Sequence, residues 1–182
     1  MVAAAAGLFG RRGVEGTSFT DIVRESGAPR GSIYYYFPAG KPQLLADAVR
    51  WTTEAVVAYQ RTCRARTPEG VVHHFVSFFR RSLESSACRA GCPLAAVAIG
   101  SYAPVEVLRG SVRPGFRAWA AVLTDQLRTA GLRPGRARSV ATTALASVEG
   151  ALILARAEGS LRPLDAVDRA LRELASAGLA RR

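Results

Sequence analysis

The sequence has few of the residues that build disulfides and metal sites. It contains three cysteines, Cys63, Cys88 and Cys92, and two histidines, His73 and His74. An odd, small number of cysteines without a secretion signal predicts reduced thiols, and leaves a redox role for Cys88 or Cys92 open. No second Cys/His pair stands at ligand spacing, and adjacent histidines on a helix point about 100° apart. We therefore expect no metal site and no cofactor.

Long hydrophobic runs are also missing. The longest, residues 93–99 and 151–155, are far shorter than the roughly 20 apolar residues that cross a membrane. The first arginines follow the apolar N-terminal residues, which is the wrong order for a secretory signal. A chain of 182 residues that is 49% hydrophobic is typical of a folded protein of one or two domains. We expect a soluble, cytoplasmic protein.

Acidic residues are outnumbered by basic ones, 14 against 25, which gives a net charge of +11. Such an excess favours a polyanionic partner, because contacts between arginine and phosphate release counterions. The alternative is a compositional bias, since Lys41 is the single lysine and arginine is used throughout. Residues 1–50 carry a net charge of only +2. Charge alone therefore supports nucleic-acid binding weakly.

The periodicity of apolar residues is helical almost everywhere, and no strand-like alternation is present, so we expect an all-α fold. Glycine and proline mark the boundaries between the helices. We expect an N-terminal unit of residues 1–45 and a larger helical body of residues 46–182. The expected helices cover residues 2–12, 18–26, 29–37, 41–66, 69–86, 93–100, 104–130 with an interruption near Pro114-Gly115, 136–158 and 163–177.

Residues 17–41, TSFTDIVRESGAPRGSIYYYFPAGK, are typical of two short helices joined by a tight turn. Ser18 is a good N-cap for the first helix, and Gly27 can adopt the left-handed conformation that ends it. In the second helix Ile33 and Phe37 are spaced to pack inward, against Phe9, Ile22 and Val23. The three consecutive tyrosines after Ile33 cover about 300° of a helix, so one core face cannot hold them all. At least one is expected at the surface, although core packing of the others remains an alternative.

Several side chains of this segment suit contacts with DNA. Arg30 can donate to guanine or to a phosphate, and Gly31 permits close approach of the backbone. Tyrosine hydroxyls can donate to phosphate oxygens, and helix N-termini such as that at Ser18 favour phosphate. The segment thus predicts a helix-turn-helix, in which the second helix enters the major groove.

The stretch GVEGTSFTDIVRESGAPRGSIYYYFPAGKPQLLADAV resembles the DNA-binding region of the TetR family of bacterial transcriptional regulators. The extra residue in Pro38–Lys41 and the later GCPLA, residues 91–95, are similar to an LmrA/YxaF-like subgroup. The first helix begins several residues late for the family, so a preceding basic arm either is missing or lies outside this sequence. The resemblance implies a homodimer whose first three helices bind an operator in double-stranded DNA. By position it assigns DNA contacts to Ser18, Thr20, Arg30, Gly31, Ser32, Tyr34, Tyr35, Tyr36 and Lys41.

The remainder of the chain lacks catalytic motifs. It has no nucleophile elbow, no phosphate-binding glycine loop and no zinc motif, so we do not expect an enzyme. The resemblance implies instead a pocket for a small-molecule effector, and apolar, aromatic residues are the usual lining of such pockets. The alternative for each residue is plain core. The candidates are Trp51, Tyr59, Phe75, Phe78, Phe79, Leu94, Val97, Tyr102, Phe116 and Trp119.

Residues 136–177 carry small and apolar residues at close helical spacing, which allows helices to approach one another closely. The resemblance implies that they form the dimer interface, and packing within the chain is the alternative. The residues concerned are Ala141, Ala144, Leu145, Val148, Ala151, Leu152, Ala155, Leu164, Val167, Leu171 and Leu174. We therefore expect a transcriptional regulator, a repressor released from a palindromic operator by a small apolar or aromatic ligand. The alternatives are a non-specific DNA-binding protein and a regulator that needs no ligand.

Overall fold

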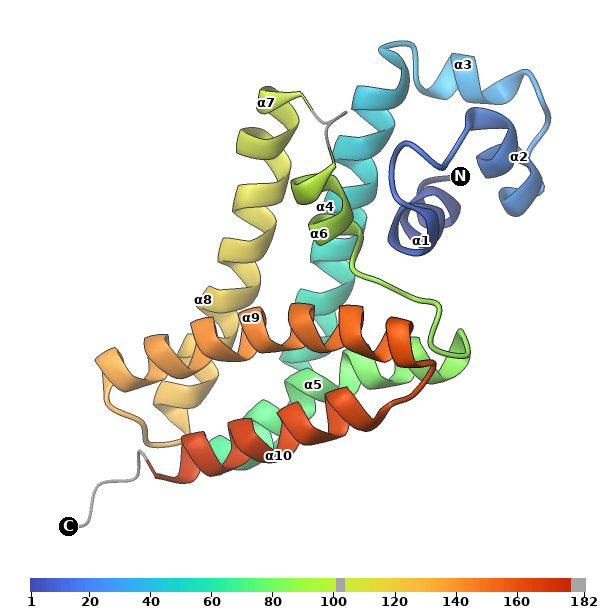
Figure 1. Cartoon of the computed structure of the whole chain (residues 1–182). Helices are drawn as coiled ribbons and strands as arrows, with labels where there is room; N and C mark the ends of the chain where they lie inside the picture. The colour runs from blue at the N-terminus through green and yellow to red at the C-terminus, as the bar shows by residue number, and fades with distance from the viewer. Residues whose placement is uncertain (101–103, 178–182) are drawn as a thin grey trace. The chain divides into compact units, whose positions relative to one another are not determined.

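The computed structural model describes residues 1–100 and 104–177, and over these residues it is helical without strands (Figure 1). By contacts, the chain divides into two compact units: residues 1–55 with 91–116, and residues 56–90 with the described residues from 117 on. The all-α fold expected from the sequence is therefore confirmed. The elements are α1 (Val2–Arg12), α2 (Phe19–Ser26), α3 (Ser32–Tyr36), α4 (Gly40–Arg61), α5 (Pro68–Ser85), α6 (Pro93–Ile99), α7 (Val105–Val107), the π-helix η1 (Leu108–Val112), α8 (Arg113–Thr129), α9 (Pro134–Glu158) and α10 (Arg162–Ser176).

Two helix boundaries differ from the expected ones for clear physical reasons. The third helix begins at Ser32, not at Pro29, because the Ser32 N–H donates to the Pro29 carbonyl oxygen in a tight turn, at 3.0 Å. The interruption expected at Pro114-Gly115 lies earlier, at the π-helix Leu108–Val112. Pro114 is tolerated in the first turn of α8, where its missing N–H needs no helical partner.

Gly115 has a packing role and does not break the helix. A Cβ atom at this position would lie 2.5 Å from Thr53 Oγ1 and 2.8 Å from Leu94 Cδ2. The glycine therefore allows α8 to lie against side chains of α4 and α6.

The first unit consists of the helix-turn-helix region together with α6, α7 and η1. Helix α1 packs against both α2 and α6. The inward packing expected for Ile33 and Phe37 is confirmed, since they are 1% and 5% exposed and their expected neighbours are buried too. Other core residues of this unit are Ala5, Ala6, Leu8, Val14, Leu44, Leu45, Ala48, Val49, Leu94 and Val97.

The second unit is built on α5, α9 and α10, with the end of α4 (residues 56–61) and most of α8 (residues 117–129). Helix α10 packs against α5 and α9 and is joined to α5 by the ion pair Arg80–Asp165 and by a polar contact of 3.0 Å between His73 Nδ1 and Asp168 Oδ2. The inner face of α9 is made of small residues, among them Ala141, Ala144, Ala151 and Ala155, which are 0–1% exposed. These small residues, whose spacing suggested a dimer interface, therefore pack α9 against other parts of its own subunit.

Candidate nucleic-acid interface

The start of α2 is fixed by a reciprocal pair of hydrogen bonds. Ser18 Oγ accepts from the Asp21 N–H at 3.1 Å, and the Ser18 N–H donates to Asp21 Oδ2 at 3.0 Å. The Ser18 hydroxyl also donates to the same carboxylate oxygen, at 2.6 Å. These bonds from Ser18, helped by the charge of Arg24, lower the pKa of Asp21. The N-cap expected at Ser18 is thus present, and its one hydroxyl proton is already donated to Asp21.

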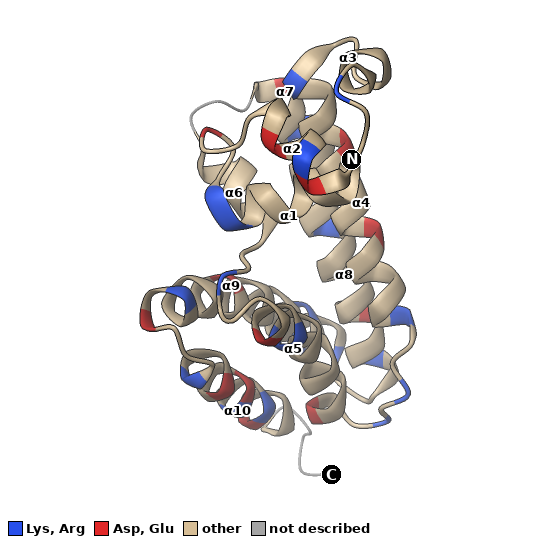
Figure 2. Cartoon of the chain, turned by 90° about the vertical axis from the view of Figure 1, so that its right-hand side faces the viewer, with Lys and Arg blue, Asp and Glu red and all other residues tan. Residues whose placement is uncertain are grey.

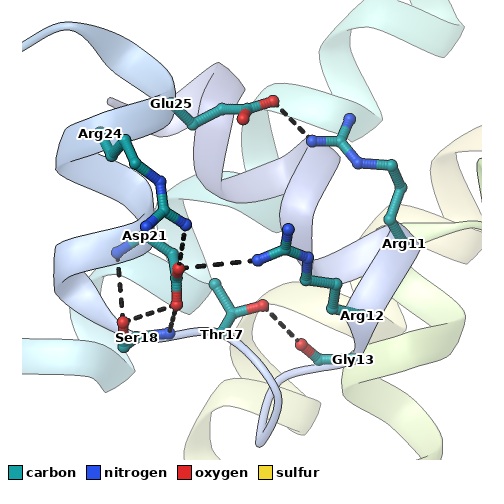
Figure 3. Close-up of polar contacts among 8 residues, drawn as sticks. All are labelled: Arg11, Arg12, Gly13, Thr17, Ser18, Asp21, Arg24 and Glu25. Carbon is teal, nitrogen blue, oxygen red and sulfur yellow. Dashed lines mark hydrogen bonds and ion pairs between the residues drawn. The ribbon is translucent and has the colours of Figure 1, made fainter.

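Ion pairs join the end of α1 to α2 (Figure 3). Arg12 Nη1 lies 3.6 Å from Asp21 Oδ1, and Arg11 Nη2 lies 2.6 Å from Glu25 Oε1. Arg24, one turn along α2, places Nη2 2.5 Å from the same Asp21 Oδ1. Asp21 is therefore the meeting point of two arginines from different helices.

The turn and α3 present aromatic side chains to solvent. Gly27 ends α2 with φ +67°, the left-handed cap expected from the sequence. In α3, Ile33 faces the core while Tyr34, Tyr35 and Tyr36 are 68%, 80% and 59% exposed. The reading of these tyrosines as core residues is therefore wrong. Helix α3 itself carries no charged residue, whereas α10 carries charges of both signs (Figure 2).

A hollow with a volume of about 510 Å³ lies between α2 and α3. Apolar side chains and two arginines share its wall, and the ring of Tyr34 meets Phe19 edge-on with centroids 5.7 Å apart. Three residues predicted to contact DNA, Thr20, Arg30 and Tyr34, thus lie on one surface. The full lining is Phe19, Thr20, Val23, Arg24, Gly27, Ala28, Arg30, Ile33 and Tyr34.

Lys41 lies in the first turn of α4 and is half-buried. Burial lowers the pKa of its ammonium group, and the nearby charge of Glu15 partly opposes this. The turn before it is held by Gln43, which accepts from the Ala39 N–H at 3.1 Å and donates to the Tyr36 carbonyl oxygen at 3.2 Å. Gln43 therefore ties α3 to the start of α4.

All nine residues predicted to contact DNA belong to the first unit, and their roles stay predictions. Eight of them lie on or beside α2 and α3, and Lys41 follows on α4. Ser32 uses its hydroxyl to donate to the Pro29 carbonyl oxygen at 2.6 Å, so a phosphate contact from it requires that bond to be exchanged. Sequence reasoning missed Gln43, Arg12 and Arg24, because only the folded chain shows which side chains they face.

The residues predicted to line an effector pocket are divided between the units. In the second unit, five of them form a continuous series of ring contacts, with centroids 5.3–6.0 Å apart: Tyr59–Phe78, Phe78–Phe79, Phe75–Phe79 and Phe79–Trp119. In the first unit, Leu94 and Val97 are fully buried, Phe116 is half-buried and Trp51 is 45% exposed. Tyr102 lies outside the described residues.

Gln60 is a polar residue that sequence reasoning missed in this aromatic region. It is 0% exposed, and its Nε2 donates to the Trp119 carbonyl oxygen at 3.1 Å. Gln126 Nε2 donates to the Gln60 carbonyl oxygen at 2.6 Å. Gln60 Oε1 is buried and accepts no hydrogen bond within the part of the chain that the structure describes. His74 stacks on Tyr59 nearby, with centroids 4.3 Å apart.

Comparison with known protein families agrees with this geometry. Residues 1–48 match the bacterial regulatory proteins of the tetR family, and residues 68–170 match the C-terminal domain of LmrA/YxaF-like transcriptional regulators. The chain belongs to the TetR family of DNA-binding transcriptional regulators. Within it, the LmrA/YxaF-like subgroup suggested by the sequence is confirmed.

Individual relatives cover nearly the whole chain. An uncharacterized HTH-type transcriptional regulator of Mycobacterium tuberculosis is 37% identical, over 100% of this chain and 95% of its own length. The HTH-type transcriptional regulator LmrA of Bacillus subtilis is 30% identical, over 90% of this chain and 88% of its own. A TetR transcriptional regulator from Legionella pneumophila has the same fold, with a TM-score of 0.84 at 23% identity over 94% and 93% of the two chains. The expectation that this chain is a regulator and not an enzyme is thereby confirmed.

Proposed function

We propose that the protein is a homodimeric repressor that leaves a palindromic operator when a small apolar or aromatic ligand binds its second unit. The main observation in support of DNA binding is that three tyrosines on α3 are exposed to solvent, beside Arg30 and the α2–α3 hollow. A fold neighbour of 20% identity, a cysteine mutant of the TetR family regulator CifR, has a structure in complex with double-strand operator DNA. We take the cytoplasm as the place of action, since operator DNA is there in bacteria.

The outer face of α9 supports the dimer. The helix is long and apolar enough for a membrane span by length and composition, yet only 39% of its most apolar window is buried. Ile153 and Leu154 are 64% and 54% exposed there, on a face that also carries Gly150 and Ala146. A large exposed apolar face usually marks a surface that is buried against a partner. The same face of a second subunit can bury it, because a two-fold interface pairs identical surfaces. Such a dimer carries two copies of α3, one for each half of a palindromic operator.

The dimer is tested by measuring the mass of the protein in solution with Ile153→Glu. We expect a dimer for the wild type and a monomer for the variant, because a carboxylate placed in an apolar interface has no partner. Ile99→Glu is the matched control, since Ile99 is 81% exposed on α6, outside the proposed interface. A dimer in both variants contradicts the assignment of α9.

The aromatic series in the second unit supports the class of effector. Rings in contact from Tyr59 to Trp119 provide an apolar environment, and Gln60 Oε1 provides a buried acceptor that lacks a donor among the described residues. Most ligand sites combine such a lining with a few polar groups. A planar aromatic compound with one hydrogen-bond donor fits both features.

The release mechanism is tested with a panel of planar aromatic compounds, first by thermal shift and then by DNA binding. A compound at about 100 times its Kd stabilises the folded state by about 2.7 kcal/mol, or roughly 5–11 °C for a chain of this size. Coupling of about 1–3 kcal/mol between the sites lowers affinity for the DNA upstream of its own gene roughly 5–150-fold. Compounds that raise the Tm but leave DNA affinity unchanged contradict the ligand-released repressor.

A further inference from the structure

We propose that Arg24 on α2 binds a backbone phosphate of the DNA, held ready for it by its ion pair with Asp21, a carboxylate that Arg12 contacts as well. The inference rests on DNA binding by the helix-turn-helix and names a contact that neither the sequence pattern nor the family resemblance assigned. It concerns positioning on the duplex and not the choice of base, because phosphates carry no sequence information.

The first argument is the place of Arg24. Its side chain lines the α2–α3 hollow together with Thr20, Arg30 and Tyr34, and it is 68% exposed. In a helix-turn-helix the second helix enters the major groove while the first crosses the backbone. A side chain of α2 that shares a surface with the exposed side chains of α3 therefore lies at the edge of the major groove, beside the DNA backbone.

The second argument is the charge around Asp21. This one carboxylate meets two guanidinium groups, those of Arg24 at 2.5 Å and Arg12 at 3.6 Å, so the group of three keeps one positive charge. Arg11 lies apart from this group and forms its ion pair with Glu25. A phosphate can therefore complete the neutralisation of the Asp21 group without breaking an existing ion pair.

The third argument is the supply of hydrogen-bond donors. Asp21 Oδ2 is taken by the Ser18 N–H and hydroxyl, so both arginines share Oδ1. The Ser18 hydroxyl has no proton left to offer a phosphate, which only accepts. A guanidinium has five N–H donors in a planar fork, and the bond to Asp21 orients the fork of Arg24 while leaving other donors free for phosphate oxygens. Arg24 therefore provides hydrogen-bond donors for a phosphate, whereas the hydroxyl proton of Ser18 is already bonded to Asp21.

The test is DNA affinity as a function of salt concentration, on a duplex from upstream of its own gene and on a scrambled duplex of equal length. We compare the wild type with Arg24→Ala, Arg24→Lys and Arg50→Ala. Arg50 is the matched control, since it is also an i,i+3 partner of an aspartate, Asp47, at 2.8 Å, with a side chain 64% exposed. Far-UV circular dichroism and the Tm check that all four proteins fold alike.

We expect Arg24→Ala to weaken binding to both duplexes on the order of tenfold per subunit, the size expected for a lost hydrogen bond to a charged group, and so about a hundredfold for the dimer. The slope of log affinity against log salt should fall by about 1.8, because the dimer loses two phosphate contacts of about 0.9 each. Arg24→Lys should keep the slope, and Arg50→Ala should match the wild type.

Two results would overturn the assignment: equal slopes for Arg24→Ala and Arg50→Ala, or a loss confined to particular base pairs. Equal affinity of the wild type for the two duplexes would instead contradict specific operator binding. In that case the slopes still decide the role of Arg24.

Discussion

Gly10 gives a sharp test of how α1 packs, because a second glycine of the same helix serves as its control. A Cβ atom at Gly10 would lie 2.4 Å from the carbonyl oxygen of Gly91, which precedes α6. Real Cβ atoms essentially never come within 3.0 Å of another atom, so the two backbone segments must separate by at least 0.6 Å. At Gly7 a Cβ atom would meet only the flexible end of Arg11, at 3.3 Å. The same substitution should therefore have opposite effects at the two positions.

The magnitudes follow from helix propensity and overpacking. Exchange of glycine for alanine within a helix stabilises by up to about 1 kcal/mol, which is the effect we expect for Gly7→Ala. At Gly10 the same gain is opposed by an overpacking cost of about 1–3 kcal/mol, near its upper end because both colliding groups belong to the main chain. Because the same gain applies at both positions, we expect Gly10→Ala to be less stable than Gly7→Ala by the overpacking cost, about 3 kcal/mol.

Thermal unfolding at one protein concentration measures this difference. For a chain of this length about 3 kcal/mol corresponds to a Tm lower by roughly 6–12 °C. Equal Tm values for Gly10→Ala and Gly7→Ala would refute the close contact between α1 and the segment before α6.

Three further predictions concern the candidate interface. Ser18→Ala should lower the free energy of unfolding by about 1 kcal/mol through loss of the N-cap, measured by urea denaturation; an unchanged midpoint would contradict the cap. The lowered pKa of Asp21 means that its contribution to stability is present above pH 3.8 and is lost as the pH falls through the lower folded pKa. The stability advantage of the wild type over Asp21→Asn should therefore shrink in acid, and a constant difference down to pH 2 would be inconsistent with this. Because the pKa of Lys41 is lowered, its ammonium group loses its charge at a pH that lies under the ordinary value of 10.5 as the solution is made alkaline. DNA affinity should therefore begin to fall at a lower pH for the wild type than for Lys41→Arg. Identical alkaline profiles in fluorescence anisotropy would show that Lys41 contributes no charge to binding.

Local signals in the sequence predicted the helix-turn-helix well. Ser18 and Gly27 act through their own backbone and that of the next few residues, so their roles as caps can be recognised without knowing the fold. For the tyrosines, helix geometry alone predicted at least one at the surface. The structure exposes all three, because Ile33 occupies the inward face of the five-residue helix.

Contacts between distant residues could not be predicted in the same way. Arg11 and Glu25 are fourteen residues apart, and Gln60 and Trp119 are fifty-nine apart. Arginines are common in this sequence, so nothing in their spacing tells which of them will face an aspartate. Pro114-Gly115 predicts a helix break because both residues weaken helices, but both lie within α8, where Gly115 packs against Thr53 and Leu94.

The grouping of α6 with the DNA-binding helices has a consequence for regulation. The expected division at residue 45 stays a prediction, while the contacts place residues 91–116 in the same compact unit as residues 1–55. Two places without room for a side chain hold this unit together, Gly10 against Gly91 and Gly115 against Thr53 and Leu94. Packed main chain cannot slide by fractions of an ångström without a steric cost, since interiors are as dense as organic crystals. A ligand that displaces α6 should therefore carry α1 with it, and α2 through the ion pairs of Arg11 and Arg12, so that a shift of α6 changes the position of the recognition helix.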